Sequence, residues 1–103
     1  MRQIIDRKLY DTDVAEEIAE HAPNTDRSDL YYLVEALYKT DDGEYFLHGA
    51  GGAATKYATS HSNGKSGGEE LTVLSEDDAV DWCEDHSIDA GIMLEEFGHL
   101  IES

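Results

Sequence analysis

Acidic side chains dominate this chain and limit the ways in which it can fold. Among its 103 residues, 24 are Asp or Glu and 7 are Lys or Arg, so that the formal net charge is −17. Like charges at this density repel one another and destabilise a compact state in dilute buffer. The acids extend along the whole chain, from Asp6 to Glu102, without forming a separate tail. The fold must therefore leave almost all of these carboxylates solvated.

The distribution of charge indicates a protein that is held in solution at very high salt. At molar salt the Debye length falls to about 3 Å, which screens most of the repulsion. Dispersed acids combined with only four lysines are typical of a halophile-type cytosolic protein. The alternative is a DNA mimic, an inhibitor whose carboxylates imitate phosphates and occupy a nucleic-acid-binding enzyme. A mimic needs its charge concentrated along one face, which distinguishes the two hypotheses.

Composition also limits the partners and the location of the protein. Direct binding to nucleic acid requires clustered Lys or Arg, which the chain lacks, and an anionic membrane surface is disfavoured for the same reason. No apolar run approaches the roughly 20 residues of a membrane span, and residues 1–6 lack the apolar segment of a signal peptide. The single cysteine, Cys83, cannot form an internal disulfide and fits a reducing cytosol. We therefore expect a cytoplasmic protein.

Two β-hairpins are predicted in the first half of the chain. Residues 2–5 and 8–11 have the pattern of short strands around a tight turn, although Asp-Arg is not a favoured turn pair. Residues 32–40 and 44–48 are rich in aromatic side chains and flank an Asp-Gly turn. These features favour strands over the helical period that the first segment also fits. A polar loop over residues 24–29 precedes this hairpin.

Helices are predicted from capping residues and apolar stripes. A first helix is expected over residues 13–22, where an Asp and a Glu three residues apart match a capping box and a proline follows. A strand over residues 71–74 leads to a second helix, which Ser75 caps and which runs to about His86. A third helix begins near Asp89 and presents a core-facing apolar stripe. That stripe consists of Met93, Phe97, Leu100 and Ile101.

Residues 49–70 are rich in glycine and serine and are predicted to form a flexible loop, with at most a helical turn over residues 55–58. The beginning of this loop matches a degenerate G-x-G-x-x-A pattern. No helix and parallel strand follow it, as a dinucleotide site requires. Thr59 stands where a phosphate-binding P-loop needs its first glycine. We therefore expect no cofactor.

Residue types that ligate metals or catalyse reactions occur without the spacing that a site needs. Cys83 and His86 lie three residues apart on a predicted helix, and His99 could approach them. A structural zinc site needs four ligands, commonly supplied as two close pairs. No Ser/His/Asp or Cys/His catalytic set is evident from the positions, and pairs of carboxylates such as Glu16-Glu17 are too frequent to discriminate. The sequence predicts neither a metal site nor an enzyme.

Aromatic side chains gather on the hairpin of residues 32–48. Strand alternation places some of them on the outer face of a sheet, where exposed aromatics are a frequent means of protein contact. Pairing across the strands in the core explains these residues as well. The candidate partner-contact residues come from this aromatic region and from the glycine-rich loop. They are Tyr31, Tyr38, Tyr45, Lys56 and Tyr57.

Four segments of the chain are similar to segments of known proteins. They are residues 4–12, 37–52, 56–58 and 73–82. Together they resemble a family of small proteins of prokaryotic and mobile-element genomes to which no activity is assigned. The shared motifs are structural and not catalytic. This chain has Asp-Arg in the first turn where the family tends to have Asn-Gly. The resemblance implies a small accessory protein tied to mobile elements, and it transfers no site residue.

The sequence thus predicts a single α+β domain over residues 1–103, in which an antiparallel sheet of two hairpins plus one strand packs with about three short helices. Its expected function is that of a non-enzymatic accessory protein that binds an unidentified protein partner. The aromatic hairpin and the glycine-rich loop are the expected contact surfaces. A homodimer is a further alternative, because the unpaired edge of an exposed hairpin can pair with a second copy of the chain.

Overall fold

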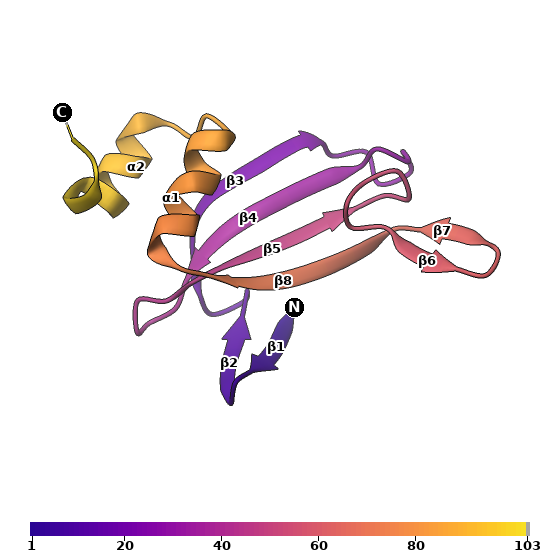
Figure 1. The fold of residues 1–103 in the computed structure, drawn as a ribbon, viewed down its shortest axis with the longest axis horizontal. Coiled ribbons are helices and arrows are strands. Elements are labelled where there is room, and N and C mark those ends of the chain that lie inside the picture. The colour runs from indigo at the N-terminus through magenta and orange to yellow at the C-terminus, as the bar shows by residue number, and fades with distance from the viewer. Residues whose placement is uncertain (103) are drawn as a thin grey trace.

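A four-stranded antiparallel sheet forms the centre of the protein (Figure 1). The computed structural model describes residues 1–102, and the strand order in this sheet is β3–β4–β5–β8. Its strands are β3 (Glu16–Asn24), β4 (Leu33–Lys39), β5 (Tyr45–Gly51) and β8 (Gly68–Leu74). Two separate hairpins pair β1 (Arg2–Ile5) with β2 (Lys8–Asp11) and β6 (Thr59–His61) with β7 (Gly64–Ser66). The remaining elements are α1 (Glu76–Asp85), α2 (Ala90–Phe97) and the 3₁₀ turn η1 (Gly98–Leu100).

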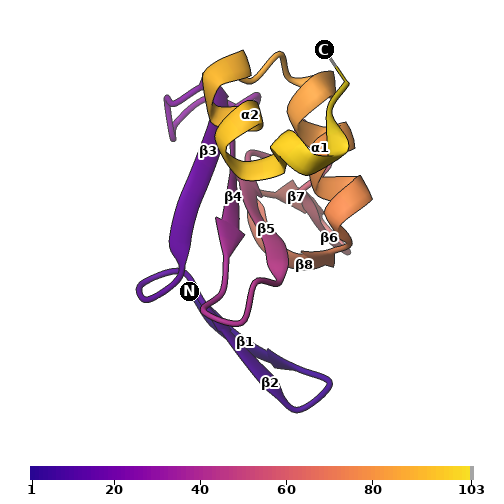
Figure 2. The same cartoon turned by 90° about the vertical axis from the view of Figure 1, so that its left-hand side faces the viewer.

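The two helices cover one face of the sheet, as Figure 2 shows. Leu37 and Leu47 occupy paired positions on β4 and β5 and are buried in one cluster with Trp82 and Phe97 of the helices. Side chains two apart on a strand share a face, so that Tyr45 joins the same core. The predicted hairpin of residues 32–48 is confirmed as β4 and β5.

The predicted starts of both helices are also confirmed. The Ser75 hydroxyl accepts a hydrogen bond from the N–H of Asp78 at 3.0 Å. The Asp89 carboxylate accepts one from the N–H of Ile92 at 3.3 Å. Each contact satisfies a backbone donor that the helix itself leaves free. Within the described residues, neither helix has the length and apolar character needed to cross a membrane.

The β1–β2 hairpin packs against the opposite face of the sheet. Tyr10 of β2 meets Phe46 of β5 edge to face, with ring centroids 5.4 Å apart, and both are buried in one cluster with Leu71. The hairpin turn has positive φ angles at both central residues, 51° at Asp6 and 67° at Arg7. Two positive angles are the mark of a type I′ turn, whose twist matches the flanking strands. The predicted first hairpin is therefore confirmed.

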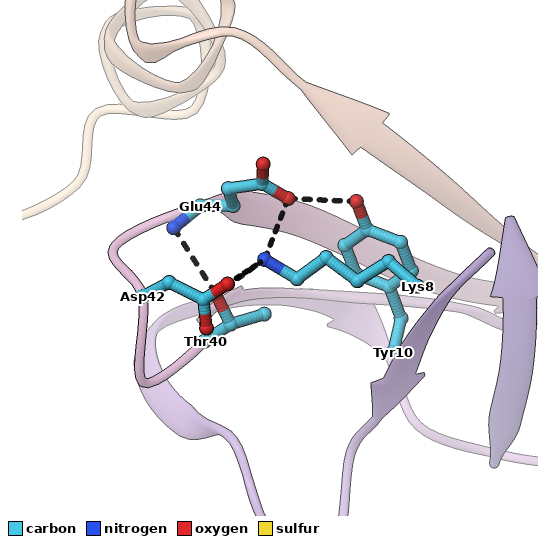
Figure 3. A network of polar contacts seen from close by, with 5 residues as sticks. All are labelled: Lys8, Tyr10, Thr40, Asp42 and Glu44. Carbon is cyan, nitrogen blue, oxygen red and sulfur yellow. Dashed lines mark hydrogen bonds and ion pairs between the residues drawn. The ribbon is translucent and has the colours of Figure 1, made fainter. Parts of the chain in front are cut away.

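Polar contacts fix this hairpin to the turn between β4 and β5 (Figure 3). Lys8 Nζ lies 2.7 Å from the Asp42 carboxylate and 2.8 Å from that of Glu44. The Tyr10 hydroxyl donates to Glu44 at 2.8 Å, and the Thr40 hydroxyl accepts the N–H of Glu44 at 3.1 Å. Hydrogen bonding to Lys8 holds the pKa of both carboxyls below their ordinary values. These contacts hold the hairpin in one orientation on the sheet.

The prediction of a helix over residues 13–22 is wrong, because this segment belongs largely to the edge strand β3. β3 pairs antiparallel with β4, and its Ala19 is buried in the core under the helices. Pro23 lies in a register shift between His21 and Asn24. An edge strand tolerates a residue without an N–H at such a position. Pairing with β4 thus outweighs the local capping pattern.

Residues 49–70, predicted as an irregular loop, form strands over much of their length. β5 continues to Gly51, β6 and β7 form a hairpin, and β8 begins at Gly68. Only the connection over residues 52–58 is irregular, and its residues 55–58 form turns instead of a helix. The α+β class is confirmed. The described residues contain two α-helices and a 3₁₀ turn where three helices were expected. The β1–β2 hairpin, expected within the main sheet, forms a two-stranded sheet of its own, and β3 occupies an edge of the main sheet.

Candidate functional site

A groove lies on the face of the sheet opposite the helices, at the end remote from the β4–β5 turn. Its volume is about 680 Å³. Its floor includes Val34, Ala50 and Glu69, which occupy neighbouring register positions on β4, β5 and β8. Its walls come from the loop of residues 25–32 and from residues 65–68, which lead from β7 into β8. These segments meet at the right-hand end of the sheet in Figure 1.

Side-chain oxygens fix the conformation of the loop of residues 25–32. The Asp26 carboxylate accepts the N–H of Ser28 at 3.0 Å. The Asp29 carboxylate accepts the N–H of Tyr31 at 2.8 Å in the same way. Such local bonds between an Asp side chain and the backbone two residues later hold a turn without regular structure. This wall of the groove is therefore preformed.

Glycines let this loop touch the connection that follows β5. The N–H of Gly52 donates to the carbonyl of Tyr32 at 2.9 Å, and the N–H of Ala54 donates to the carbonyl of Leu30 at 2.9 Å. A Cβ atom on Gly52 would lie 2.5 Å from the Leu30 carbonyl oxygen, so that no other residue fits without a backbone shift. Close packing against backbone therefore accounts for Gly52, which follows the end of β5.

Both carboxylates that line the groove are engaged within the chain. Glu69 Oε2 lies 3.0 Å from His48 Nε2 on the neighbouring strand. The Asp29 carboxylate is held by the N–H of Tyr31, as described above. Among the described residues, neither acid forms an ion pair with the cations that line the same groove.

Two cations line the groove without an ion pair, and two exposed apolar side chains belong to the loop that forms one wall. Arg27 and Lys65 form no ion pair with any of residues 1–102. The Arg27 guanidinium lies 5.8 Å from the centre of the Tyr32 ring. Leu30 and Tyr31 are 61% and 67% exposed, although both are large and apolar. The groove therefore combines free positive charge with exposed apolar surface.

On the helix side of the sheet, a buried carboxylate joins three parts of the chain. Glu35 of β4 is 2% exposed. Its Oε2 lies 2.8 Å from Lys56 Nζ and accepts a hydrogen bond from the Tyr57 hydroxyl. Its Oε1 accepts the indole N–H of Trp82 at 3.1 Å and lies 3.4 Å from His86 Nε2. These five residues, here named the Glu35 cluster, connect β4, the segment between β5 and β6, and α1.

The contacts of the Glu35 cluster keep its carboxylate ionised. Burial raises the pKa of Glu35, but hydrogen bonds, that from Lys56 being the largest, outweigh burial and bring the pKa below its ordinary value. Burial and then the bond to Glu35 raise the pKa of Tyr57, so that its hydroxyl stays a donor. Burial lowers the pKa of His86, and the ring of His21, stacked 3.9 Å away, lowers it further. Since the fold uses both oxygens of Glu35, the cluster acts as an anchor.

The structure separates the five predicted partner-contact residues. Tyr31 is exposed and lies between Leu30 and Tyr32, which line the groove, whereas Lys56 and Tyr57 belong to the Glu35 cluster. Tyr38 is half-buried and stacks on a phenylalanine ring at 5.2 Å between centroids. Tyr45 is 5% exposed, because strand alternation turns its ring toward the helices. Tyr45 is therefore not available as a surface contact. None of the five lines the groove, although Tyr31 lies in the loop that forms one of its walls.

The residues that the sequence offered as metal ligands, Cys83, His86 and His99, are not grouped around one point. Cys83 is buried, and burial raises the pKa of its thiol to about 11. His86 faces Glu35, and His99 Nε2 lies 2.9 Å from the Glu76 carboxylate. Within residues 1–102, no three side chains of His, Cys, Asp or Glu are grouped so as to hold a metal ion.

Sequence reasoning missed Glu35, Arg27 and Lys65. For Glu35 a signal exists, since it is an acid within the otherwise apolar run of residues 33–37. A charged residue at such a position needs buried partners. For Arg27 and Lys65 no such signal exists, because only the return of β8 beside β5 brings their segments together.

Comparison of the chain with protein-family models, with curated protein sequences and with solved structures finds no match. The groove and the Glu35 cluster are therefore interpreted from their own geometry.

Proposed function

We propose that this protein is a non-enzymatic protein-interaction module of a salt-rich cytosol and that it binds its partner in the groove. One observation carries this proposal. In a chain with a net charge of −17, the groove brings the unpaired cations Arg27 and Lys65 beside the exposed Leu30, and the exposed Tyr31 follows Leu30 in the same loop. Exposed aromatic side chains and arginines are enriched at protein interfaces. Loops on a rigid sheet are also common carriers of recognition.

The shape of the groove supports a binding function. Its volume of about 680 Å³ lies in the range of ligand-binding clefts. Its walls are held by turns and backbone contacts that exist before any partner arrives. A preformed surface loses less conformational entropy on binding.

The reactive groups outside the groove are in states that do not favour catalysis, which supports a non-enzymatic function. Both oxygens of Glu35 already accept hydrogen bonds within the fold. The raised pKa of Cys83 keeps its thiol protonated at neutral pH, and a protonated thiol is a weak nucleophile. These groups stabilise the scaffold and leave the groove as the surface for function.

A photoreactive amino acid at Tyr31 is expected to capture the partner. Tyr31 is exposed and lies between Leu30 and Tyr32, which line the groove, so that a benzophenone side chain there would reach a protein bound in it. In an extract of the cells that express the protein, kept at molar KCl, irradiation should give one discrete cross-linked product. Filling the floor with Ala50→Phe should remove this product.

The matched control places the same photoreactive group at Val14. This residue is 74% exposed and lies beside the β4–β5 turn, at the other end of the sheet. It should give no product, or a different one. Equal labelling from both positions, or labelling that Ala50→Phe leaves unchanged, would show that the groove is not the binding surface.

The spread of exposed acids supports adaptation to salt over DNA mimicry. Six of the ten residues of α1 are acidic, which makes this helix the nearest approach to a continuous anionic ridge. Exposed acids also occur on β3 and β8 and in the turns at both ends of the sheet. A duplex mimic would concentrate its charge on one face, as the alternative hypothesis requires. An accessory role also agrees with the resemblance to small mobile-element proteins.

Salt is expected to stabilise the fold strongly. Raising KCl from about 0.1 M to about 2 M shortens the Debye length to less than 3 Å and screens the repulsion between carboxylates. We expect Tm to rise by about 10 °C, which corresponds to roughly 2 kcal/mol for a domain of this size. Differential scanning calorimetry at several KCl concentrations measures this rise.

A variant with fewer charges serves as the control for the salt effect. The last turns of α1 carry Asp81, Glu84 and Asp85 and no basic residue, so that these acids face the negative end of the helix. Their replacement by Asn or Gln should raise Tm in dilute buffer and reduce the response to KCl. A melt that does not change with KCl in either protein would contradict the salt adaptation.

A further inference from the structure

Resting on the proposed function, we infer that the segment of the partner that occupies the groove is an extended acidic peptide. Its carboxylates pair with Arg27 and Lys65, and its apolar side chains lie on the floor and against the rim. This inference names the chemistry of the partner, which the proposed function leaves open.

The charges of the chain point to this occupant. Three of the seven basic residues, Lys8, Lys39 and Lys56, already form ion pairs with carboxylates. Arg27 and Lys65 form none within residues 1–102, although the chain holds 24 acids. Both line the same groove, where they leave positive charge unused on an otherwise anionic surface.

The other two basic residues without ion pairs lie elsewhere. Arg2 and Arg7 belong to the β1–β2 hairpin, which packs on the far end of the sheet. They line none of the groove. Among the described residues, the groove is therefore the concave surface that unpaired basic side chains line.

Among the described residues, neither acid that lines the groove forms an ion pair with these cations. Glu69 is held by His48, and Asp29 by the N–H of Tyr31. An incoming carboxylate would meet a guanidinium and an ammonium whose hydrogen-bonding capacity toward acids is unused. Charge-assisted bonds of this kind, bidentate for arginine, are the strong polar contacts of protein recognition.

The floor of the groove favours an extended peptide. Val34 and Ala50 are small apolar side chains at paired positions on adjacent strands, which leaves room above the sheet. An extended peptide turns alternate side chains to opposite sides. One set can therefore contact the apolar floor while the other reaches Arg27 and Lys65 at the walls.

High salt removes the main objection to an acidic partner. In dilute buffer the net charge of −17 repels any anionic peptide. At molar salt the Debye length of about 3 Å or less screens this long-range repulsion, whereas a carboxylate and a cation in direct contact in the groove are partly buried and are screened much less. Binding then depends on the groove and not on the overall charge.

The inference is tested with synthetic peptides of about six residues. Isotope-labelled protein in about 2 M KCl is titrated with a capped peptide of alternating glutamate and valine, and with one in which lysine replaces glutamate. The glutamate peptide should shift the amide resonances of Ala50 and Gly67 and bind with a Kd about tenfold lower than the lysine peptide. The double variant Arg27→Glu, Lys65→Glu should reverse this preference.

Arg2→Glu with Arg7→Glu is the matched control, because it makes the same change in net charge outside the groove. It should leave both Kd values unchanged. The inference is overturned if the glutamate peptide causes no shifts in the groove, if both peptides bind equally, or if the two double variants have the same effect. If the Tyr31 cross-link captures a protein whose bound segment lacks acids, the proposed function stands and this inference fails. If neither cross-link nor peptide binding occurs, both fail.

Discussion

Replacing Glu35 with alanine is expected to lower the free energy of unfolding by about 3–5 kcal/mol. The carboxylate is 2% exposed and accepts hydrogen bonds from three side chains, those of Lys56, Tyr57 and Trp82. Without it, the indole N–H and the phenol lose their acceptor in a buried site, where an unsatisfied polar group is costly. Urea denaturation followed by tryptophan fluorescence measures the loss.

Glu69→Ala is the matched control for this prediction. Glu69 also lies on a strand of the central sheet and forms one ion pair, with His48, but its side chain is exposed. Exposed pairs contribute about 0–1 kcal/mol, so that this variant should be nearly as stable as the natural chain. Equal costs for Glu35→Ala and Glu69→Ala would mean that the Glu35 cluster does not anchor the segment between β5 and β6.

Local signals were sufficient for those parts of the fold in which sequence and pairing agree. The hairpin of β4 and β5 has aromatic and β-branched residues around an Asp-Gly turn. Ser75 precedes three acids that favour the positive end of α1. In such segments propensity, capping and burial all favour one structure.

β3 shows where local reasoning fails. Its sequence contains an Asp and a Glu at capping-box spacing, followed by a proline, and these features favour a helix. The strand forms because β4 offers an unpaired edge and because Ala19 and Ile18 reach the core under the helices. Neither fact can be known before the sheet is assembled.

The candidate site was beyond prediction for a related reason. The groove combines a loop before β4, the end of β5 and the start of β8, and no pattern within one of these segments indicates the others. Tyr45 and Tyr31 both belong to the aromatic region, yet one is buried and the other exposed. Tyr45 lies on β5 and turns toward the helices, whereas Tyr31 lies in the loop before β4, where no element of residues 1–102 covers its ring.

Gly49→Ala is expected to lower the free energy of unfolding by about 3 kcal/mol, which is large for the addition of one methyl group. A Cβ atom on Gly49 would overlap the ring and the hydroxyl of Tyr57, which crosses β5 to reach Glu35. The ring would have to leave this position and would lose its hydrogen bond to the carboxylate. The glycine is therefore needed for the space above it, and its φ is not positive.

A double-mutant cycle separates this explanation from a general intolerance of alanine in β5. Tyr57→Ala removes the ring, so that Gly49→Ala in that background should cost about 0–1 kcal/mol, and the two effects should be strongly non-additive. Gly98→Ala is the matched control, because Gly98 is helical and a Cβ atom there meets nothing within 4 Å. Alanine at this position should be neutral or stabilise by about 0.4–1 kcal/mol. Additive costs at Gly49 and Tyr57, measured by urea denaturation, would mean that the ring does not occupy the space above the glycine.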